Sequence, residues 1–531
     1  MNLSLHLGRR WLPLLAVFLF AGIWLSSAWY VLARRLPAHD VATGLEADRL
    51  SNLVNYPNCR FGLGGSIEPY SVTQLNLGWY LNWQTALHPF RPNGEEYVQV
   101  IRMKYYSGTI VFNPPTSTLS AMIDQNPGAL WLVGNEPDSP YQDNLRPEDY
   151  ARAYQQAYLF IKARDPSARV GAGNIVQPTP LRMQYLDRVL QTYQQTFHQA
   201  LPADVWSVHS YILRELSPYD PEACLIVDPN TGQCSPGPLS LWGADIPPGI
   251  TATRGLLYEF SDMFKDSIFR QRLIDFRQWL RDRGYRQTPL YITEFGTLFP
   301  YPPYSTYIDD QGHTVVFTYT DELGQDMTEA RTALFMTRTF GILQNLSSSA
   351  TGYPADDNHL VQRWLWYSSD DPKFGGLLFD PTTHQRRPLG DVFAAYTTAI
   401  SPTVDWMVAQ AWAAPVFQTG GLPVTATLQA QISNSGNVSS STAITVTFYD
   451  GPIGQPGTQV IDRRTITPHL SGCGDSLILS ADWPRLRAGS HLFVVAVQAA
   501  AAEQNMNNNV LTGTVLVATE RLWLPLISRA Y

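Results

Sequence analysis

The sequence predicts an α/β fold, a (β/α)₈ TIM barrel, followed by a C-terminal all-β sandwich of the immunoglobulin-like type. Three observations lead to this expectation. Short apolar runs alternate with helical patterns up to about residue 400 of the 531-residue chain, which is typical of a parallel sheet covered by helices. Two of these runs end in a glutamate. From about Ala399 onward, apolar and polar residues alternate between Asn, Ser and Gly turns, which indicates antiparallel strands. We therefore expect the barrel over residues 59–400 and the sandwich over residues 401–520.

Eight apolar runs are the candidates for the barrel strands. In chain order they are Arg60–Gly65, Leu77–Trp83, Tyr97–Met103, Ala129–Gly134, Ala168–Gly173, Val205–Tyr211, Pro289–Gly296 and Leu360–Tyr367. Three helices between them are well marked. One has Pro147 in its first turn with acidic residues beside it, a second ends at Gly284, and a third spans Glu329–Asn345.

The fourth and seventh strands each end in a glutamate. Glu136 stands in "ALWLVGNEPD", directly before Pro137, and Glu294 stands in "PLYITEFG". A single glutamate in such a place usually caps a helix or pairs with a basic neighbour. In a (β/α)₈ barrel, however, the carboxyl ends of the strands build the active site, so two such glutamates meet at one rim. Paired carboxylates are what glycosidic bond cleavage requires, because one protonates the leaving oxygen while the other attacks or activates water.

The composition argues against several other functions. The formal net charge is -8 and no basic stripe is present, so nucleic acid is not an expected partner. There is no Cys-x-x-Cys pair, no His-Glu-x-x-His helix, no phosphate-binding glycine loop and no Gly-x-Ser-x-Gly turn, so we expect neither a metal nor an organic cofactor. The 15 Trp, 27 Tyr and 22 Phe residues suit large cores and also the flat faces of sugar rings.

Residues 1–35 have the features of an export signal. An uncharged, mostly apolar stretch over residues 11–33 is flanked by two arginines on each side and is long enough to span a bilayer as a retained anchor. The Ser-Ser-Ala at residues 26–28 offers the rival interpretation, a cleaved signal peptide. Both alternatives place the rest of the chain outside the cell or at its surface, after a polar linker over residues 36–58.

The four cysteines fit an exported protein. Cys224 and Cys234 flank a turn-rich segment and are near enough in sequence to staple one loop. Cys59 and Cys473 fall in different predicted domains, so the sequence alone does not pair them.

Taken together, these motifs resemble those of a known group of enzymes. "GNEPD" on the fourth strand and "TEFG" on the seventh look like the acid/base and nucleophile motifs of clan A glycoside hydrolases, which are retaining enzymes. "VHSY" on the sixth strand is similar to the His-x-Tyr that clan members often place beside the site. "GWYLNW" and "RWLWY" look most like the family of fungal-type β-1,3-glucan hydrolases. The likeness covers about Cys59 to Ile400, and the insertions over residues 213–249 and 298–319 depart from that family.

The resemblance implies a role for each matching residue. Glu136 is the expected general acid/base, with a raised pKa, and Glu294 is the expected nucleophile. Asn135 is expected to bind the sugar 2-hydroxyl, Tyr211 to hold Glu294 through its hydroxyl, and His209 either to line the cleft or to be an ordinary buried histidine. The carboxyl groups of Glu136 and Glu294 are expected roughly 5–5.5 Å apart, the spacing of retaining enzymes. The partner is then an oligosaccharide or polysaccharide with β linkages.

Aromatic and polar residues of the second, third and eighth units complete the expected cleft. Trp366 is the candidate for the floor under the scissile sugar, with ordinary core packing as the alternative, and Arg102 is the candidate for steadying the charge of the nucleophile. The remaining cleft candidates are Trp79, Tyr80, Asn82 and Trp83.

The region after residue 400 resembles a second family. "ISNSGN", "VTFYDG", "AGSHLFVVAV" and "NMNNNV" are similar to adhesion-related immunoglobulin-like modules of the CARDB type, which implies a spacer or attachment role. The short apolar tail over residues 521–531 is either an edge strand or a sorting element.

Two other classes of protein stay open from the sequence. One is a catalytically inactive carbohydrate-binding protein, and the other is an adhesion or envelope protein whose sandwich is the working part. The matched pair of glutamates favours the enzyme, because a binding protein does not need two carboxylates at one rim.

Overall fold

The computed structural model describes residues 57–217, 243–298, 304–308, 314–318, 320–418, 420–499, 503 and 505–519. The expected export signal, all but the last two residues of the linker, the cysteines at 224 and 234, and the tail over residues 521–531 lie outside this described part. None of the described helices is long and apolar enough to cross a membrane.

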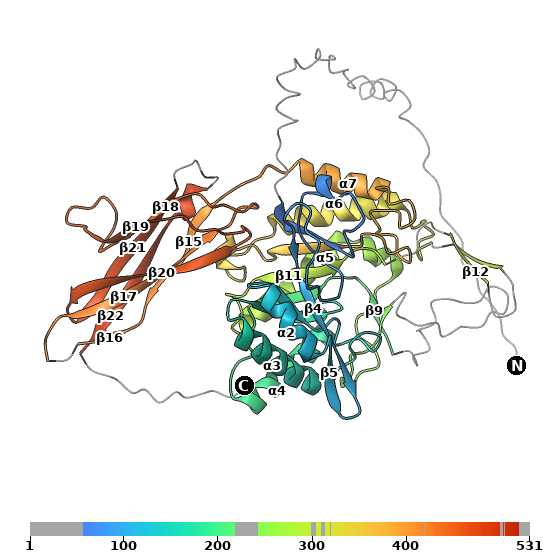
Figure 1. The fold of residues 1–531 in the computed structure, drawn as a ribbon, viewed down its shortest axis with the longest axis horizontal. Coiled ribbons are helices and arrows are strands. Elements are labelled where there is room, and N and C mark those ends of the chain that lie inside the picture. The colour runs from blue at the N-terminus through green and yellow to red at the C-terminus, as the bar shows by residue number, and fades with distance from the viewer. Residues whose placement is uncertain are drawn as a thin grey trace, which may run out of the picture. The chain divides into compact units, whose positions relative to one another are not determined.

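Residues 58–398 form a mixed α/β structure around a curled sheet of mostly parallel strands (Figure 1). In pairing order its strands are β3 (Glu96–Tyr97), β2 (Leu77–Leu81), β1 (Asn58–Gly64), β14 (Arg363–Tyr367), β11 (Leu290–Phe295), β8 (Val205–His209), β7 (Arg169–Ile175), β6 (Leu130–Val133), β4 (Gln99–Tyr106) and β5 (Thr109–Asn113). Each of the eight predicted strands is present, with bounds that differ by no more than three residues.

The chain connects β3, the first strand of this order, directly to β4, the last of the parallel strands, because only Val98 separates them. The Val98 N–H donates to the carbonyl oxygen of Tyr80 in β2 at 3.0 Å. The sheet is therefore strongly curled. Its strands run parallel except for β5, which is antiparallel to β4 and forms a hairpin with it.

Helices alternate with the strands and share a core with them. They are α2 (Thr116–Gln125), α3 (Pro147–Arg164), α4 (Pro180–Phe197), α5 (Asp266–Asp282), α6 (Glu329–Asn345) and α7 (Pro388–Thr398). Pro147 begins α3 as predicted, and Thr328 caps α6 by accepting the N–H of Arg331 at 3.3 Å. Aromatic rings dominate the packing between sheet and helices, where Phe61 meets Phe340 edge to face at 5.1 Å.

The two predicted insertions contain short paired strands. The first holds β9 (Arg214–Glu215) and β10 (Gly243–Ala244), and the second holds β12 (Tyr304–Ile308) and β13 (Thr314–Thr318). Short 3₁₀ turns complete the α/β part: η1 (Thr73–Leu75), η4 (Phe260–Phe264) and η5 (Pro354–Asp356).

The C-terminal part is all-β, as the alternating pattern predicts. One sheet contains β15 (Trp406–Ala413), β17 (Val424–Asn434) and β20 (Asp475–Leu486). The other contains β16 (Val416–Phe417), β22 (Val510–Ala518), β21 (Gly489–Ala499), β18 (Ile444–Tyr449) and β19 (Val460–Ile466), with the turn η6 (Met506–Asn508) before β22. The two sheets share one apolar core, which includes Trp406, Leu428 and Phe493.

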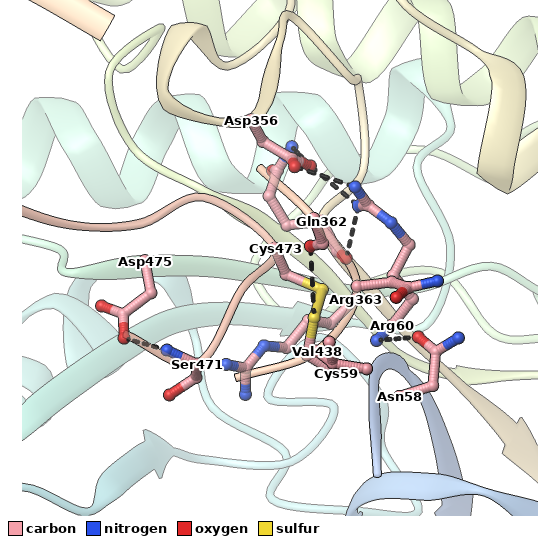
Figure 2. Close-up of a disulfide and its surroundings, with 12 residues drawn as sticks. Asn58, Cys59, Arg60, Asp356, Gln362, Arg363, Val438, Ser471, Cys473 and Asp475 are labelled. Carbon is pink, nitrogen blue, oxygen red and sulfur yellow. Dashed lines mark hydrogen bonds and ion pairs between the residues drawn. A yellow bond between two sulfur atoms is a disulfide. The ribbon is translucent and has the colours of Figure 1, made fainter. Parts of the chain in front are cut away.

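A disulfide joins the α/β part to these strands, although the sequence did not pair its cysteines. Cys59 in β1 is bonded to Cys473, which lies 414 positions further along the chain (Figure 2). Beside it the buried Arg60 donates to both carboxylate oxygens of Asp356, at 2.8 and 2.9 Å, and to the carbonyl oxygen of Ser435 at 3.2 Å. The pairing of these cysteines depends on how the α/β part packs against the C-terminal strands, and the spacing of cysteines in a sequence carries no information on that packing.

Candidate active site

Glu136 follows β6 in a turn that buried groups hold in place. Gly134 and Glu136 have positive φ angles of 87° and 45°, a conformation that costs a glutamate about 1 kcal/mol. The Glu136 N–H donates to the carbonyl oxygen of Asn174 in β7 at 2.9 Å, and the Asn135 N–H donates to the Asp143 carboxylate at 2.9 Å. These bonds compensate for the backbone strain and present the Glu136 side chain at the carboxyl end of the strand.

Glu294 lies near the end of β11, and its carboxylate accepts hydrogen bonds from two aromatic side chains. The Tyr211 hydroxyl donates to Oε2 at 2.9 Å, and the Trp83 indole N–H donates to Oε1. Because an indole N–H can only donate, Oε1 of Glu294 must act as an acceptor. The two contacts fix the orientation of the carboxylate and favour its ionised form.

His209, at the end of β8, lies between the two carboxyl groups. Its Nδ1 is 2.9 Å from Oε1 of Glu136, and its Nε2 is 3.4 Å from Oε1 of Glu294. A neutral imidazole has one N–H and can donate to one carboxylate, whereas the protonated ring can donate to both. Burial lowers the pKa of His209, but the negative charges of Glu294 and Glu136 outweigh burial and raise that pKa above its ordinary value.

One ring nitrogen of His209 and one carboxylate oxygen each of Glu136 and Glu294 lie within 4.8 Å of one another. Residues of these types also bind divalent cations. Here, however, Nδ1 of His209 lies 2.9 Å from an oxygen of Glu136 and Nε2 lies 3.4 Å from an oxygen of Glu294, so each ring nitrogen already faces a carboxylate. The arrangement suits shared protons better than a single ion with all three ligands.

Burial raises the pKa of Glu294 to about 7, and the charge of Glu136 adds to the rise, while His209 and the bonds from Trp83 and Tyr211 oppose it. This rise is found at Glu294, whereas the sequence predicts one at Glu136. The structure buries Glu294 more deeply, with its side chain 8% exposed against 13% for Glu136. Two carboxyl groups this close cannot both ionise freely, so protons are shared within the cluster near neutral pH.

A cavity of about 320 Å³ opens in front of the two glutamates, at the low end of the range for ligand sites. Its walls come from the carboxyl ends of the strands and from the segments that follow them, chiefly the residues after β2, the loop between β6 and α3, the residues from the end of β8 to β10, and the residues after β11 and β14. Aromatic rings and polar groups alternate in these walls, which include Trp83, Tyr141, Gln142, Asp245, Tyr367 and Phe374. This mixture suits a ring with hydroxyl groups around its edge.

A buried ion network supports the turn that carries Glu136. Arg182 in α4 is completely buried and donates to the carboxylate of Asp138, to Oε1 of Glu215 at 2.9 Å and to the carbonyl oxygen of Asp245 at 2.7 Å. Asp138 follows Glu136 by two residues, and Glu215 belongs to β9. The network therefore connects the turn that carries Glu136 to the wall formed by the insertion.

Seven of the predicted site residues come together at the cavity. Glu136, Glu294, Asn135, Tyr211, Trp83 and Arg102 line it, and His209 bonds to the carboxylates inside it. The expected bond from the Tyr211 hydroxyl to Glu294 is present. Arg102 does not steady Glu294, which corrects that expectation. Its guanidinium donates to Asp143 at 2.6 Å and to Gln142 at 2.9 Å, because β4 directs it toward the loop after β6.

Trp366 lies in the core and not under the cavity. It is completely buried, its indole N–H donates to the carbonyl oxygen of Gly376 at 2.7 Å, and its ring meets Phe295 edge to face at 5.3 Å. Residues alternate between the two faces of a strand, so Trp364 and Trp366 share the helix-facing side of β14 while Tyr367 faces the cavity.

Trp79 and Asn82 also lie away from the cavity. Trp79 is completely buried inside the curled sheet, 6.1 Å from the ring of Tyr291. Asn82 accepts a hydrogen bond from the Tyr97 hydroxyl at 2.5 Å, and Tyr80 donates from its hydroxyl to the carbonyl oxygen of Phe90 at 2.6 Å. All three side chains serve the packing of β2 against its neighbours.

Sequence reasoning missed several residues that the site uses. Tyr141, Tyr367 and Phe374 line the cavity, and Asp143 and Asn174 hold the turn of Glu136. Strand parity on β14 carried the signal for Tyr367. The loop residues carried none, because their positions depend on how the chain folds around the strand ends.

Comparisons with known proteins are consistent with this geometry. Residues 64–217 match the family model of the glycosyl hydrolase catalytic core, a stretch that contains Glu136, His209 and Tyr211 but ends before Glu294. This match supports a glycoside hydrolase. Among curated proteins no relative matches the chain.

Solved structures similar to the chain include three enzymes of family GH128. They are endo-β-1,3-glucanases from Sorangium cellulosum (subgroup II, 15% identity, TM-score 0.36) and from Amycolatopsis mediterranei in complex with laminaritriose (subgroup I, 16%, 0.37), and a curdlan-specific exo-β-1,3-glucanase from Blastomyces gilchristii in complex with glucose (subgroup III, 15%, 0.35). Each similarity covers 64% of this chain and 98 or 99% of the other. Scores this low do not carry the neighbours' activities over to this chain.

Proposed function

We propose that the protein is an exported retaining glycoside hydrolase that cleaves β-linked glycans through a double displacement. The observation that carries this proposal is the pair of glutamates at the ends of β6 and β11, which His209 bridges. Both glutamates line a cavity whose other walls are aromatic and polar side chains. The match of residues 64–217 to a glycosyl hydrolase core supports the same conclusion.

The spacing of the two carboxyl groups favours retention over inversion. A carboxylate oxygen of Glu136 and one of Glu294 lie within 4.8 Å of each other. Retaining enzymes hold their carboxyl groups roughly 5–5.5 Å apart, whereas inverting enzymes need roughly 6.5–9.5 Å to leave room for water. A water molecule does not fit between groups this close in the manner that inversion requires.

The hydrogen bonds around Glu294 favour the nucleophile's role for that residue. Trp83 and Tyr211 donate to its two oxygens, which stabilises a carboxylate and orients it. Among the residues that the structure describes, His209 alone bonds to the carboxylate of Glu136, which is also the more exposed of the two glutamates; this suits a group that must exchange protons with leaving group and water.

The reaction then runs in two steps. In the first, the reactive form has Glu294 ionised and the shared proton on Glu136: Glu294 attacks the anomeric carbon while Glu136 gives that proton to the departing glycosidic oxygen, which forms a glycosyl ester on Glu294. In the second, Glu136 takes a proton from water, the resulting hydroxide displaces Glu294, and the sugar leaves with its original anomeric configuration. His209 can take up or supply a proton between the two carboxylates as their charges change.

A panel of fluorogenic aryl β-glycosides together with laminarin, curdlan and cellulose oligosaccharides tests this proposal. We expect turnover of at least one substrate by the wild-type protein and its loss in Glu294→Ala. The β-1,3-glucans are included because the structural neighbours named above are β-1,3-glucanases. No turnover of any substrate by a folded wild-type protein would favour an inactive carbohydrate-binding or adhesion protein.

Export, domain limits and barrel closure belong to the same proposal. The arginine-flanked apolar stretch over residues 11–33 supports export, as does a disulfide at Cys59, because disulfides persist in oxidising compartments. The bond from Val98 to Tyr80 supports closure of the curled sheet as a (β/α)₈ barrel over residues 59–400. We assign residues 401–520 to an immunoglobulin-like module of the CARDB type. N-terminal sequencing of the mature protein separates a cleaved signal from a retained anchor.

A further inference from the structure

The hairpin of β4 and β5 starts at the cavity, and beyond Arg102 one of its two faces is exposed. Residues 99–101 of β4 pair with β6, whereas residues 102–106 pair only with β5. Figure 1 shows the hairpin as a ribbon that extends away from the sheet. Ser107 and Gly108 join its strands with positive φ angles of 48° and 85°, the geometry of a tight type I′ turn, so the ribbon is short-looped and well defined.

Strand alternation divides the hairpin into two faces. On one face Met103 is completely buried, and Ile110 and Phe112 pack against the core of the α/β part. This face attaches the hairpin to the fold. Tyr105 belongs to it by parity but lies beyond the core and is 52% exposed.

The other face is exposed and continuous with the cavity. It carries, from the cavity outward, Arg102, Lys104 and Tyr106, with the cross-strand partners Asn113, Val111 and Thr109. Arg102 lines the cavity. Tyr106, four residues further along the strand and so about 13 Å away, is 72% exposed, and Val111 between them is 47% exposed.

We propose that this exposed face is a glycan-binding surface that extends the cavity, with Tyr106 as the platform on which a sugar ring stacks. Its ligand is the part of a β-linked oligosaccharide or polysaccharide that projects from the cavity, so the inference rests on the proposed function. A tyrosine ring has a flat apolar face and a polar edge, which matches a sugar ring, and the ammonium of Lys104 can donate to hydroxyl groups beside it.

The position of Tyr106 carries the argument, because single exposed aromatic residues are common on protein surfaces. Here the residue stands on a tightly turned hairpin, on the same face as a cavity-lining arginine, and contributes nothing to the core. A tyrosine side chain has only two torsion angles to order when it binds, so little of the affinity that stacking supplies is lost to side-chain entropy.

Tyr106→Ala and Tyr105→Ala form a matched pair for the test, since they remove neighbouring exposed rings from opposite faces of one hairpin. For both variants we would measure kcat/KM on an aryl β-glycoside that the wild-type protein cleaves and on laminarihexaose and cellohexaose, and binding of the same hexasaccharides by calorimetry. Tyr106→Ala is expected to raise KM and Kd for the preferred hexasaccharide by about 3- to 10-fold, the range of one aromatic stacking contact. Its kcat/KM on the aryl glycoside is expected to equal that of the wild type. Tyr106→Phe is expected to restore binding, and Tyr105→Ala to match the wild type.

Two outcomes would contradict the proposed glycan-binding surface. These are an unchanged KM and Kd for Tyr106→Ala on a hexasaccharide that the wild type cleaves, or an equal loss in Tyr105→Ala. If the wild type binds a hexasaccharide and cleaves no glycan, the proposed function fails, while loss of binding in Tyr106→Ala alone still supports the surface. A wild-type protein that neither binds nor cleaves either hexasaccharide contradicts both.

Discussion

The Glu294→Gln variant is predicted to be more stable than the wild-type protein above pH 7 and about equally stable near pH 4. Burial raises the pKa of Glu294 from 4.5 to about 7. The folded protein therefore holds this proton more tightly than the unfolded chain does, and ionisation of Glu294 as the pH rises from 4.5 through 7 costs stability. At 1.36 kcal/mol per pKa unit, the cost reaches ~3 kcal/mol at pH 8.

Glutamine has nearly the shape of a protonated glutamate and does not ionise, so the substitution removes this cost. Its amide oxygen can still accept from Trp83, and its NH₂ can donate to the Tyr211 hydroxyl. Urea unfolding followed by tryptophan fluorescence at pH 4 and pH 8, with the disulfide intact, measures the difference in unfolding free energy. Glu148→Gln, in the first turn of α3 at the surface, is the control for the substitution itself.

The expected result is a gain of ~3 kcal/mol for Glu294→Gln at pH 8 that falls toward zero at pH 4, with no such trend for Glu148→Gln. A gain that is the same at both pH values would refute the argument, because it would come from packing and not from the buried charge. A loss at pH 8 would mean that the bonds from Trp83 and Tyr211 outweigh burial.

Three further predictions follow from individual contacts. Trp83→Phe removes a donor that lowers the pKa of Glu294, so the acid limb of the kcat/KM–pH profile moves to higher pH, whereas Trp366→Phe, in the core, leaves that limb in place. The double substitution of Cys59 and Cys473 by serine lowers the unfolding free energy by about 2–5 kcal/mol, measured by urea unfolding, because a very long loop is no longer closed. Arg182→Met leaves two buried carboxylates without their partner and destabilises the protein by about 3–5 kcal/mol, and an unchanged melting temperature would contradict this.

The strands and the two glutamates were readable from the sequence because each rests on a local pattern. A buried strand is a run of apolar residues, and Glu136 and Glu294 each stand at the end of such a run. The family resemblance supplied His209 and Tyr211 as neighbours of the two carboxyl groups. The positions at which sequence reasoning failed depend on parity and on packing between distant segments.

Trp366 and Tyr367 illustrate the first kind of failure, since a shift of one residue exchanges the core face of β14 for the cavity face. Arg102 illustrates the second, because its partner Asp143 belongs to a loop whose path no local pattern encodes. The bond between Cys59 and Cys473 and the burial of Arg182 between two carboxylates are of the same kind. The raised pKa at Glu294 follows from depth of burial, which a sequence does not report.

The central claim is that Glu294 is the nucleophile and Glu136 the acid/base of a retaining hydrolase. Azide rescue of the two glutamate variants tests this claim most directly. With an aryl β-glycoside that has a good leaving group, Glu294→Ala with azide is predicted to yield a glycosyl azide of inverted configuration, because a single displacement occurs. Glu136→Ala with azide is predicted to yield the retained configuration, because azide intercepts the glycosyl ester on Glu294. Proton NMR of the products reads the two configurations. The opposite pair of configurations would show that the roles are reversed, and the absence of rescue in both variants of an active enzyme would contradict the double displacement.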